Sequence, residues 1–316
     1  MLLILTSDKD LAADYLIVEL IERGLPYFRL NAEALTTAQY SFSLSDGCAN
    51  RWLKVGPREL DLKTVRAVWY RRAIQPTPPT DLDPGERVFV AGEFRHLATG
   101  LVLDTKARWV NPIDRVYVAE HKLFQLRIAR RIGFRIPRTF VSNDLCALKE
   151  FARENPGNSI CKPIFHGLFL DGHERYSVYT RRITPESLDN QESVSACPVM
   201  LQEEIPKAAD LRATFIGREC FVADIENADP SQLDWRNPGA QLRYSTSRLS
   251  EEIEDKCRAM LNELGLVYGA FDFVRTPANE LVFLEVNPTG EWAWLEEQLG
   301  FPMRRAFVRL FYEDPI

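Results

Sequence analysis

The sequence predicts a mixed fold class, an α/β unit at the N-terminus followed by α+β units, in a chain of 316 residues. Residues 2–6 are apolar, residues 9–23 have a helical pattern and residues 26–31 form a second extended stretch, which is the βαβ pattern of a parallel sheet. Later in the chain, apolar stretches pair as hairpins around two helices, which favours α+β architecture. A chain of this length holds two or three domains. We expect them at residues 1–115, 116–200 and 201–316.

The composition excludes several classes of protein. Apolar residues make up 46% and charged residues 27%, so the chain has the material for a hydrophobic core and is not disordered. The net charge of -6 provides no overall basic field, so we expect no nucleic-acid partner, and any anionic ligand needs a local cluster of cations. No stretch approaches the roughly 18 apolar residues of a membrane span. The first residues lack a basic leader and a cleavage site, so we expect no membrane partner and a cytoplasmic location.

The first predicted unit contains the βαβ pattern and a further strand at residues 66–72, RAVWYRR. A proline-rich turn follows, then a helix that begins near Glu86, and the unit ends near the WVNP segment at residues 109–112. Two interpretations of VWYRR stay open. Its arginines either extend from a strand into solvent, or they take part in peptide binding or a domain contact.

The other two units have clear helix signals. A helix near residue 119 ends at Gly133, and a strand at residues 158–164 carries Lys162. A hairpin is expected to turn at Gly217. Residues 251–264 form a helix with Ser250 as N-cap and Gly265 after its end.

Two carboxylates and one amide are conspicuous in an apolar hairpin near the C-terminus. Asp272 lies between two phenylalanines, and Glu285 and Asn287 are two residues apart, so their side chains share one face of a strand. A five-residue turn around Ala278 places Asp272 opposite residue 284 or 285. Each residue alone is more simply explained as an exposed polar side chain. Together they predict a hard-cation site, best filled by magnesium bound to a nucleotide phosphate.

Two lysines complete a set of residues for phosphoryl chemistry. Lys162 is isolated in an apolar strand, where a lysine is rarely buried without an anionic partner; the alternative is a residue at the strand edge that reaches solvent. Lys122 lies near the start of a helix. Lysines supply positive charge for phosphates, and the oxygen ligands would hold the metal that bridges them.

The common phosphate-binding motifs are absent from the sequence, which has neither G-x-x-x-x-G-K-[ST] nor the kinase signature set. The order of Lys122, Lys162, the strand LQEEI, the DLR segment, Asp272 and the EVN segment resembles the ATP-grasp ligases. More specifically, VWYRR, WVNP, AEHK, QEEIPKAADLRATFIG, LDWR, VYGAFDFV and LEVNPTGEWAWLE resemble the graspetide synthetases, microviridin-type enzymes that mature ribosomal peptides. The similarity covers nearly the whole chain. Trp292 and Trp294 of the last motif are expected to be packing residues.

The resemblance implies an ATP-grasp fold with a pre-ATP-grasp domain, a central lid-like domain and a C-terminal catalytic domain. It also implies a role for each matching residue. Lys122 and Lys162 would contact the ATP phosphates, Asp210 would lie near the ribose, and Arg212 and Arg236 would face the reaction centre. The adenine hinge would be formed by Gln202, Glu203, Glu204 and Ile205. The magnesium ligands would be Asp272, Glu285 and Asn287.

The function implied by the resemblance is ATP-dependent macrocyclisation of a ribosomal precursor peptide. Side-chain carboxylates of Asp or Glu would be activated as acyl phosphates and then condensed with Ser or Thr hydroxyls or with Lys amines. ATP and Mg²⁺ are the implied cofactors, and relatives suggest a homodimer. Two alternatives stay open: an ATP-grasp ligase that joins an amino acid to a small molecule or protein tail, and a regulator that binds nucleotide without catalysis.

Overall fold

The computed structural model describes residues 1–45, 48–72, 74–103, 105–165, 167–171, 174–229, 232–237 and 239–313. Its N-terminal unit is built on a parallel sheet with strand order β2-β1-β6-β7. The strands are β1 (Leu2–Thr6), β2 (Tyr27–Asn31), β6 (Ala67–Tyr70) and β7 (Arg108–Val110). All five residues of β1 are buried, as expected for a central strand between two packed faces. Helix α1 (Leu11–Glu22) begins at the N-cap Asp10 and buries Leu16 and Leu20.

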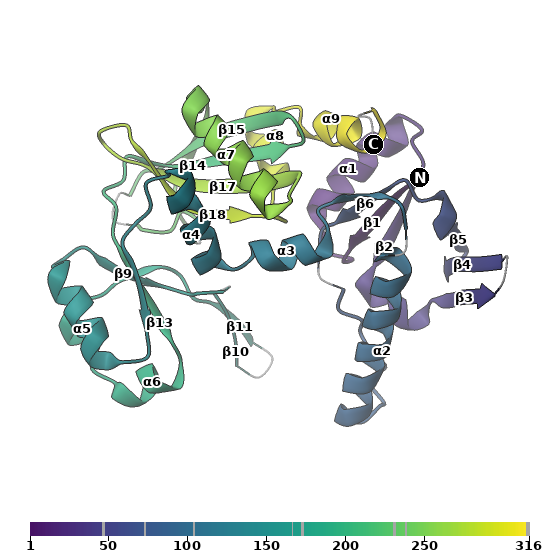
Figure 1. The fold of residues 1–316 in the computed structure, drawn as a ribbon, viewed down its shortest axis with the longest axis horizontal. Helices are drawn as coiled ribbons and strands as arrows, with labels where there is room; N and C mark the ends of the chain where they lie inside the picture. Colours follow the sequence, from purple (N-terminus) through teal and green to yellow (C-terminus); the bar gives the residue numbers. More distant parts are fainter. Residues whose placement is uncertain are drawn as a thin grey trace.

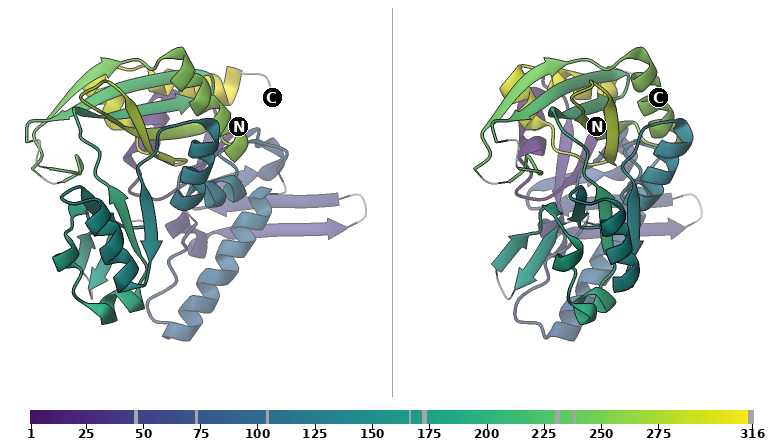
Figure 2. Two further views of the ribbon diagram at one scale, coloured as in Figure 1. Left: turned by 60° about the vertical axis from the view of Figure 1, so that its left-hand side comes forward. Right: turned by 90° about the vertical axis from the view of Figure 1, so that its left-hand side faces the viewer.

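An antiparallel sheet that the sequence analysis did not assign extends from this unit. It comprises β3 (Gln39–Ser45), β4 (Cys48–Val55) and β5 (Arg58–Asp61), between the short 3-10 helices η1 (Ala32–Thr37) and η2 (Leu62–Thr64). The alternation of Tyr40, Phe42 and Leu44 with serines was an available signal for the first strand. Figure 2 shows the β3–β4 hairpin and the long helix α2 (Pro84–Leu103) extending away from the C-terminal sheet.

The middle unit contains an antiparallel sheet with strand order β12-β9-β13-β8. Its strands are β8 (Thr139–Ser142), β9 (Ser159–Lys162), β12 (Arg181–Arg182) and β13 (Val199–Glu203). The separate hairpin of β10 (Leu168–Asp171) and β11 (Glu174–Ser177) lies beside it, and helices α5 (Leu145–Glu154), η3 (Pro185–Ser187) and α6 (Gln191–Ala196) complete the unit. Leu148 of α5 is fully buried in a small core with Leu201 of β13.

The C-terminal unit is a five-stranded antiparallel sheet with strand order β16-β15-β14-β17-β18. Its strands are β14 (Ala209–Ile216), β15 (Glu219–Asn227), β16 (Leu242–Ser247), β17 (Tyr268–Arg275) and β18 (Leu281–Asn287). Helix α7 (Glu251–Leu264) has the expected caps: Ser250 accepts a hydrogen bond from the Ile253 amide, and Gly265 adopts the left-handed conformation. The helices α3 (Ile113–Ala119) and α4 (Lys122–Ile132) connect the N-terminal unit to this sheet (Figure 1).

The end of the chain returns to the N-terminal unit (Figure 1), where α8 (Ala293–Leu299) and α9 (Met303–Val308) lie beside α1 and the π-helix η4 (Arg309–Glu313) follows α9. Trp292 is fully buried, and its ring centroid lies 4.9 Å from that of Phe307 and 6.4 Å from that of Tyr15. The prediction that Trp292 is a packing residue is confirmed. One core therefore joins residues from both ends of the chain. The three domain ranges assigned from the sequence stay a prediction.

Within the residues that the structure describes, no helix has both the length and the apolar character needed to cross a membrane.

Candidate active site

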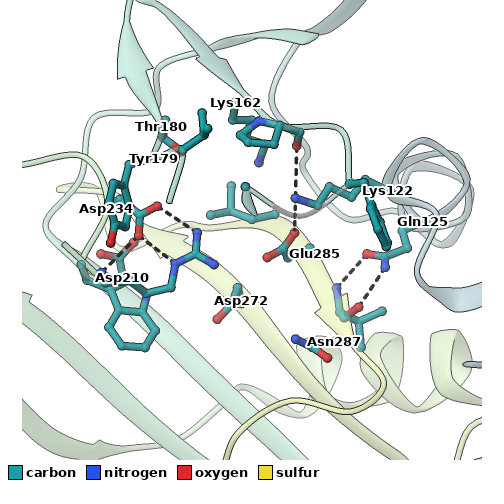
Figure 3. A pocket seen from close by; sticks show the side chains of 18 of the residues that line it. Lys122, Gln125, Lys162, Tyr179, Thr180, Asp210, Asp234, Asp272, Glu285 and Asn287 are labelled. Atoms are coloured by element: carbon teal, nitrogen blue, oxygen red, sulfur yellow. Dashed lines mark hydrogen bonds and ion pairs between the residues drawn. The ribbon is translucent and has the colours of Figure 1, made fainter. Parts of the chain in front are cut away.

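A cavity of about 580 Å³ lies between the middle unit and the C-terminal sheet (Figure 3). Helix α4, strand β9, the segment after β11, the 233–236 turn and the β17–β18 hairpin all contribute to its walls. Most of the site residues predicted from the sequence line this one cavity: Lys122, Lys162, Asp210, Arg236, Asp272, Glu285 and Asn287. The structure therefore brings together residues that are up to 165 positions apart in the sequence (287 minus 122).

The two predicted carboxylates face each other across neighbouring strands. Asp272 of β17 is paired in register with Glu285 of β18, next to a β-bulge between Asp272 and Phe273. On its other side Asp272 is paired with Arg212 of β14, and Arg212 Nη1 lies 3.0 Å from Asp272 Oδ2. Burial raises the pKa of Asp272 to about 6, although the charge of Arg212 opposes this shift.

Glu285 has a cationic environment. Lys122 Nζ lies 3.2 Å from Glu285 Oε2 and donates a hydrogen bond to the carbonyl oxygen of Pro163 at 3.3 Å (Figure 3). Burial alone would raise the pKa of Glu285. The nearby charges of Lys122, Lys162 and Arg236 together outweigh burial, so the pKa of Glu285 is lowered. Of the paired carboxylates, Glu285 therefore stays ionised more readily than Asp272.

Lys162 ends β9 and points into the cavity (Figure 3). Burial lowers the pKa of its ammonium group to about 8, a shift that Glu285 opposes and Lys122 reinforces. A desolvated lysine beside another cation is favourably placed for an added anion, because the anion would compensate both charges.

Arg236 is held by a neighbouring carboxylate that the sequence analysis missed. Its Nε and Nη2 atoms lie 2.8 and 2.9 Å from the two carboxylate oxygens of Asp234, a bidentate pair. Asp234 is 6% exposed and also accepts a hydrogen bond from the Arg236 backbone amide at 3.1 Å. Burial opposes ionisation of Asp234, but the hydrogen bonds and charge of Arg236 outweigh it and lower the pKa of Asp234. The DWR motif itself was the available signal, since its Asp and Arg are two residues apart.

A third lysine, Lys207, supports the wall of the cavity that carries Asp234. Lys207 Nζ lies 2.9 Å from Asp210 Oδ2 and 2.9 Å from the carbonyl oxygen of Leu233. Lys207 thus connects the start of β14 to the segment that carries Asp234. Burial raises the pKa of Asp210, against the opposing charge of Lys207.

The residues predicted to hold magnesium fit that ion. Asp272, Glu285 and Asn287 present carboxylate and amide oxygens, the hard ligands that Mg²⁺ prefers. Asp272 and Glu285 face each other across paired strands, and Asn287 follows on the same strand as Glu285. Asn287 Oδ1 is partly used, because it accepts a hydrogen bond from the Thr289 amide at 3.0 Å.

The predicted hinge residues lie outside the walls of the cavity. Gln202 is buried and donates to Thr139 Oγ1 at 2.8 Å, while Glu204 forms a bidentate ion pair with Arg182 at 2.6 and 2.7 Å. The Glu203 amide donates to the Arg138 carbonyl oxygen at 2.9 Å, and Ile205 packs in a small apolar cluster with Leu284, which does line the cavity. Their role at adenine stays a prediction. Arg212 does not line the cavity either, and it contacts the site through its hydrogen bond to Asp272.

The open question about VWYRR has a structural answer for its first arginine. Arg71 is 1% exposed, and its guanidinium lies 3.2 Å from Asp10 Oδ2 and 3.2 Å from Glu291 Oε1. It also donates to the carbonyl oxygens of Thr289 and Gly290, at 2.9 and 3.2 Å. Arg71 therefore makes a contact between the N-terminal unit and the segment that follows β18.

Asn111 of the WVNP segment makes a second such contact. Its side-chain nitrogen donates to the carbonyl oxygens of Tyr268 and Pro288, both at 2.8 Å. Its side-chain oxygen accepts from the Val267 and Tyr268 amides at 2.8 and 3.0 Å. The sequence showed Asn111 as part of a motif, but its four partners are distant in the chain.

Comparison with known proteins is informative over the whole chain. Residues 1–117 match the family model described as the MvdD pre-ATP grasp domain. No curated protein sequence matches the chain.

Two solved structures from Microcystis aeruginosa MRC are similar over almost their full length. The macrocyclase MdnC, bound with the precursor peptide MdnA, is 32% identical, with a TM-score of 0.87 and coverage of 98% of this chain and 99% of that chain. The macrocyclase MdnB is 30% identical, with a TM-score of 0.83 and coverage of 99% of both chains. The RiPP-associated ATP-grasp ligase of Chryseobacterium gregarium, in complex with ADP and a leader and core peptide, shares the fold at 23% identity, with a TM-score of 0.87 and coverage of 99% of this chain and 97% of that chain.

These similarities confirm the fold class and the family predicted from the sequence. The chain belongs to the graspetide synthetases, the microviridin-type peptide ligases of the ATP-grasp superfamily.

Proposed function

We propose that this enzyme uses ATP and Mg²⁺ to activate Asp or Glu side chains of a ribosomal precursor peptide and to close rings with Ser or Thr hydroxyls or Lys amines. The observation that carries the proposal is the cavity in which two lysines, an arginine and the Asp272–Glu285 pair meet. Such a set can hold two anions, the γ-phosphate of ATP and a substrate carboxylate, close together against their repulsion.

In the first step, an oxygen of the substrate carboxylate attacks the γ-phosphorus, the bond to the β-phosphate oxygen breaks, and ADP leaves. Lys122 and Lys162 would bind the phosphate oxygens, and Arg236, oriented by Asp234, would face the transferred group. Asp272, Glu285 and Asn287 would hold Mg²⁺, which neutralises charge on the phosphates when bound. The product of this step is an acyl phosphate.

In the second step, a hydroxyl or amine of the same peptide attacks the acyl carbon. Phosphate leaves with the electron pair of the broken C–O bond, and the nucleophile loses its proton. The result is an ester from Ser or Thr and an amide from Lys. No covalent nucleophile of the enzyme is needed, so positioning of the two peptide groups supplies much of the rate.

The alternatives predict different products from the same cavity. A ligase that adds an amino acid to a small molecule or a protein tail would release ADP only with that acceptor. A regulator would bind nucleotide without hydrolysis. The family membership and the complete set of phosphate and metal residues both favour the peptide ligase. A homodimer and a cytoplasmic location stay predictions.

The test combines the purified enzyme with ATP, Mg²⁺ and a candidate precursor peptide, a short Thr-, Ser-, Asp- and Glu-rich sequence to be sought among the reading frames beside its gene. Ring closure is expected to lower the peptide mass by about 18 Da per ring, the mass of one water lost when a carboxylate condenses through an activated intermediate. The Glu285→Gln variant serves as the inactive control. ADP release without a change in peptide mass would contradict the proposed acceptor, and absence of ATP turnover would favour the regulator.

A further inference from the structure

Helix α4 binds the outer edge of β18 at Val286, the residue between the predicted metal ligands Glu285 and Asn287. Strand β18 is the last strand of its sheet, so alternate backbone groups along it have no strand partner. Gln125 of α4 fills this position at Val286. Its Nε2 donates to the Val286 carbonyl oxygen at 2.8 Å, and its Oε1 accepts from the Val286 amide at 2.8 Å (Figure 3). One side-chain amide therefore replaces a neighbouring strand at a single residue.

The environment of Gln125 makes this contact rigid. The residue is 2% exposed, and its Nε2 also donates to the carbonyl oxygen of Ala119 at the end of α3. Loss of the side-chain amide would leave the buried amide and carbonyl of Val286 without these partners, which costs more than the net value of a hydrogen bond. The hydrogen bond to Ala119 therefore fixes the Gln125 side chain, and Gln125 in turn fixes the backbone of β18 at Val286.

The same helix face reaches two successive residues of β18. Lys122 and Gln125 are three positions apart and therefore project on one side of α4. Lys122 forms the ion pair with Glu285, while Gln125 binds the backbone of Val286. Glu285 and Asn287 flank Val286 directly, so a shift of the Val286 backbone would move both of them.

The part of β18 that lies farther from the cavity is held by a backbone hydrogen bond instead. The Phe283 amide donates to the carbonyl oxygen of Arg135 at 2.9 Å. Asp272 lies on β17, which has strand partners on both sides. Of the three predicted ligands, the two on β18 therefore depend on a side chain for the position of their backbone.

We propose that Gln125 is a positioning residue for the metal site, which holds Glu285 and Asn287 at the separation that the ion needs. This inference rests on the proposed function, because it assumes that these residues bind a divalent cation with the nucleotide. Residues that orient metal ligands from behind contribute about 10- to 100-fold to metal affinity.

The test measures binding of Mn²⁺ to the full-length protein in the presence of ADP, by water-proton relaxation, which distinguishes protein-bound Mn²⁺ from Mn²⁺–ADP in solution. Gln125→Met keeps the length of the side chain and removes both hydrogen bonds to Val286. We expect it to weaken Mn²⁺ binding about 10-fold or more, with metal-free ADP affinity unchanged. Gln125→Glu keeps the acceptor for the Val286 amide and serves as a second variant if Gln125→Met does not fold; we expect a smaller loss.

Thr276→Val is the matched control on the same hairpin. Thr276 is 6% exposed, and its Oγ1 accepts from the Glu280 amide at 3.1 Å, at the turn opposite the metal end. The control is expected to lower the thermal midpoint without changing Mn²⁺ affinity. Equal Mn²⁺ affinity in Gln125→Met and the unmodified protein would overturn the positioning role, as would an equal loss in Thr276→Val. Absence of protein-bound Mn²⁺ in the unmodified protein would instead remove the proposed function and this inference with it.

Discussion

The guanidinium of Arg71 and the carboxylate of Asp10 form a buried ion pair, with Arg71 Nε 3.2 Å from Asp10 Oδ2 and both side chains at most 1% exposed. Asp10 is also the N-cap of α1, where it accepts a hydrogen bond from the Ala13 amide, and it accepts another from the Thr6 hydroxyl. Through Arg71, this pair connects the start of the chain to Glu291, just beyond β18.

The Asp10–Arg71 pair predicts a dependence of stability on pH. Burial would raise the pKa of Asp10, but Arg71 and Thr6 outweigh it and lower the pKa below its ordinary value of 3.8. A lowered folded-state pKa means that the ionised carboxylate stabilises the fold above 3.8, and that this contribution is lost as the pH falls below that value. We expect Asp10→Asn to reduce the free energy of unfolding at pH 7 by about 3 kcal/mol, as for other broken buried ion pairs.

Urea denaturation at pH 7 and at pH values below 4 checks this prediction, since the difference between Asp10→Asn and the unmodified protein should shrink in acid. Glu22→Gln, at an exposed position of the same helix, is the control. A difference that stays constant down to the lowest pH would contradict the assigned role of the carboxylate.

The proposed metal ligands predict loss of turnover without loss of fold. Glu285→Gln and Asp272→Asn preserve the shape of each side chain and remove one negative charge. Because an isosteric amide still partners Arg212 or Lys122, the folded structure should persist, while ADP release should fall by about 100-fold or more, as when other groups that stabilise transition-state charge are removed. Circular dichroism and ADP release are measured together. Parallel loss of folded protein and activity would show that these residues act through packing.

The Asp234–Arg236 pair predicts that a lysine cannot replace this arginine. Arg236→Lys keeps the positive charge but cannot form the two parallel hydrogen bonds to Asp234. We expect kcat/KM for the peptide to fall by about 100-fold, within the range for loss of one preorganised donor. Arg243→Lys, exposed on β16, should be unchanged. Near-normal activity of Arg236→Lys would place the arginine outside the reaction centre.

The half-buried Lys162 predicts opposite effects on stability and on nucleotide binding. Its pKa is lowered to about 8 by burial, so the charged form is costly in the nucleotide-free protein. Lys162→Met should therefore leave the thermal midpoint unchanged or raise it, while ADP affinity falls by about 10-fold, or about 1.4 kcal/mol. Calorimetric titration with ADP measures the affinity, and Lys149→Met on α5 is the control. Unchanged ADP affinity would contradict a phosphate contact.

Local patterns were enough to predict the first βαβ unit, helix α7 and the pairing of the β17–β18 hairpin, but not the sheet of β3, β4 and β5. The caps Ser250 and Gly265 marked the ends of α7, and the short turn placed Asp272 opposite residue 284 or 285, where the structure pairs it with Glu285. Both results depend on interactions between residues close in sequence, where spacing sets geometry directly.

The sequence by itself determined the fold class, the family and seven of the residues that line the cavity, because these follow from local periodicity and from motifs. Only the tertiary structure decided the partners that hold the site: Gln125 at Val286, Asn111 at Tyr268 and Pro288, and Arg71 at Asp10 and Glu291. Each of these contacts joins separate elements, in most cases more than 150 positions apart in the chain. A buried amide or guanidinium has no periodic signature, so its partners are determined only when the packed units bring distant backbone groups within hydrogen-bond distance.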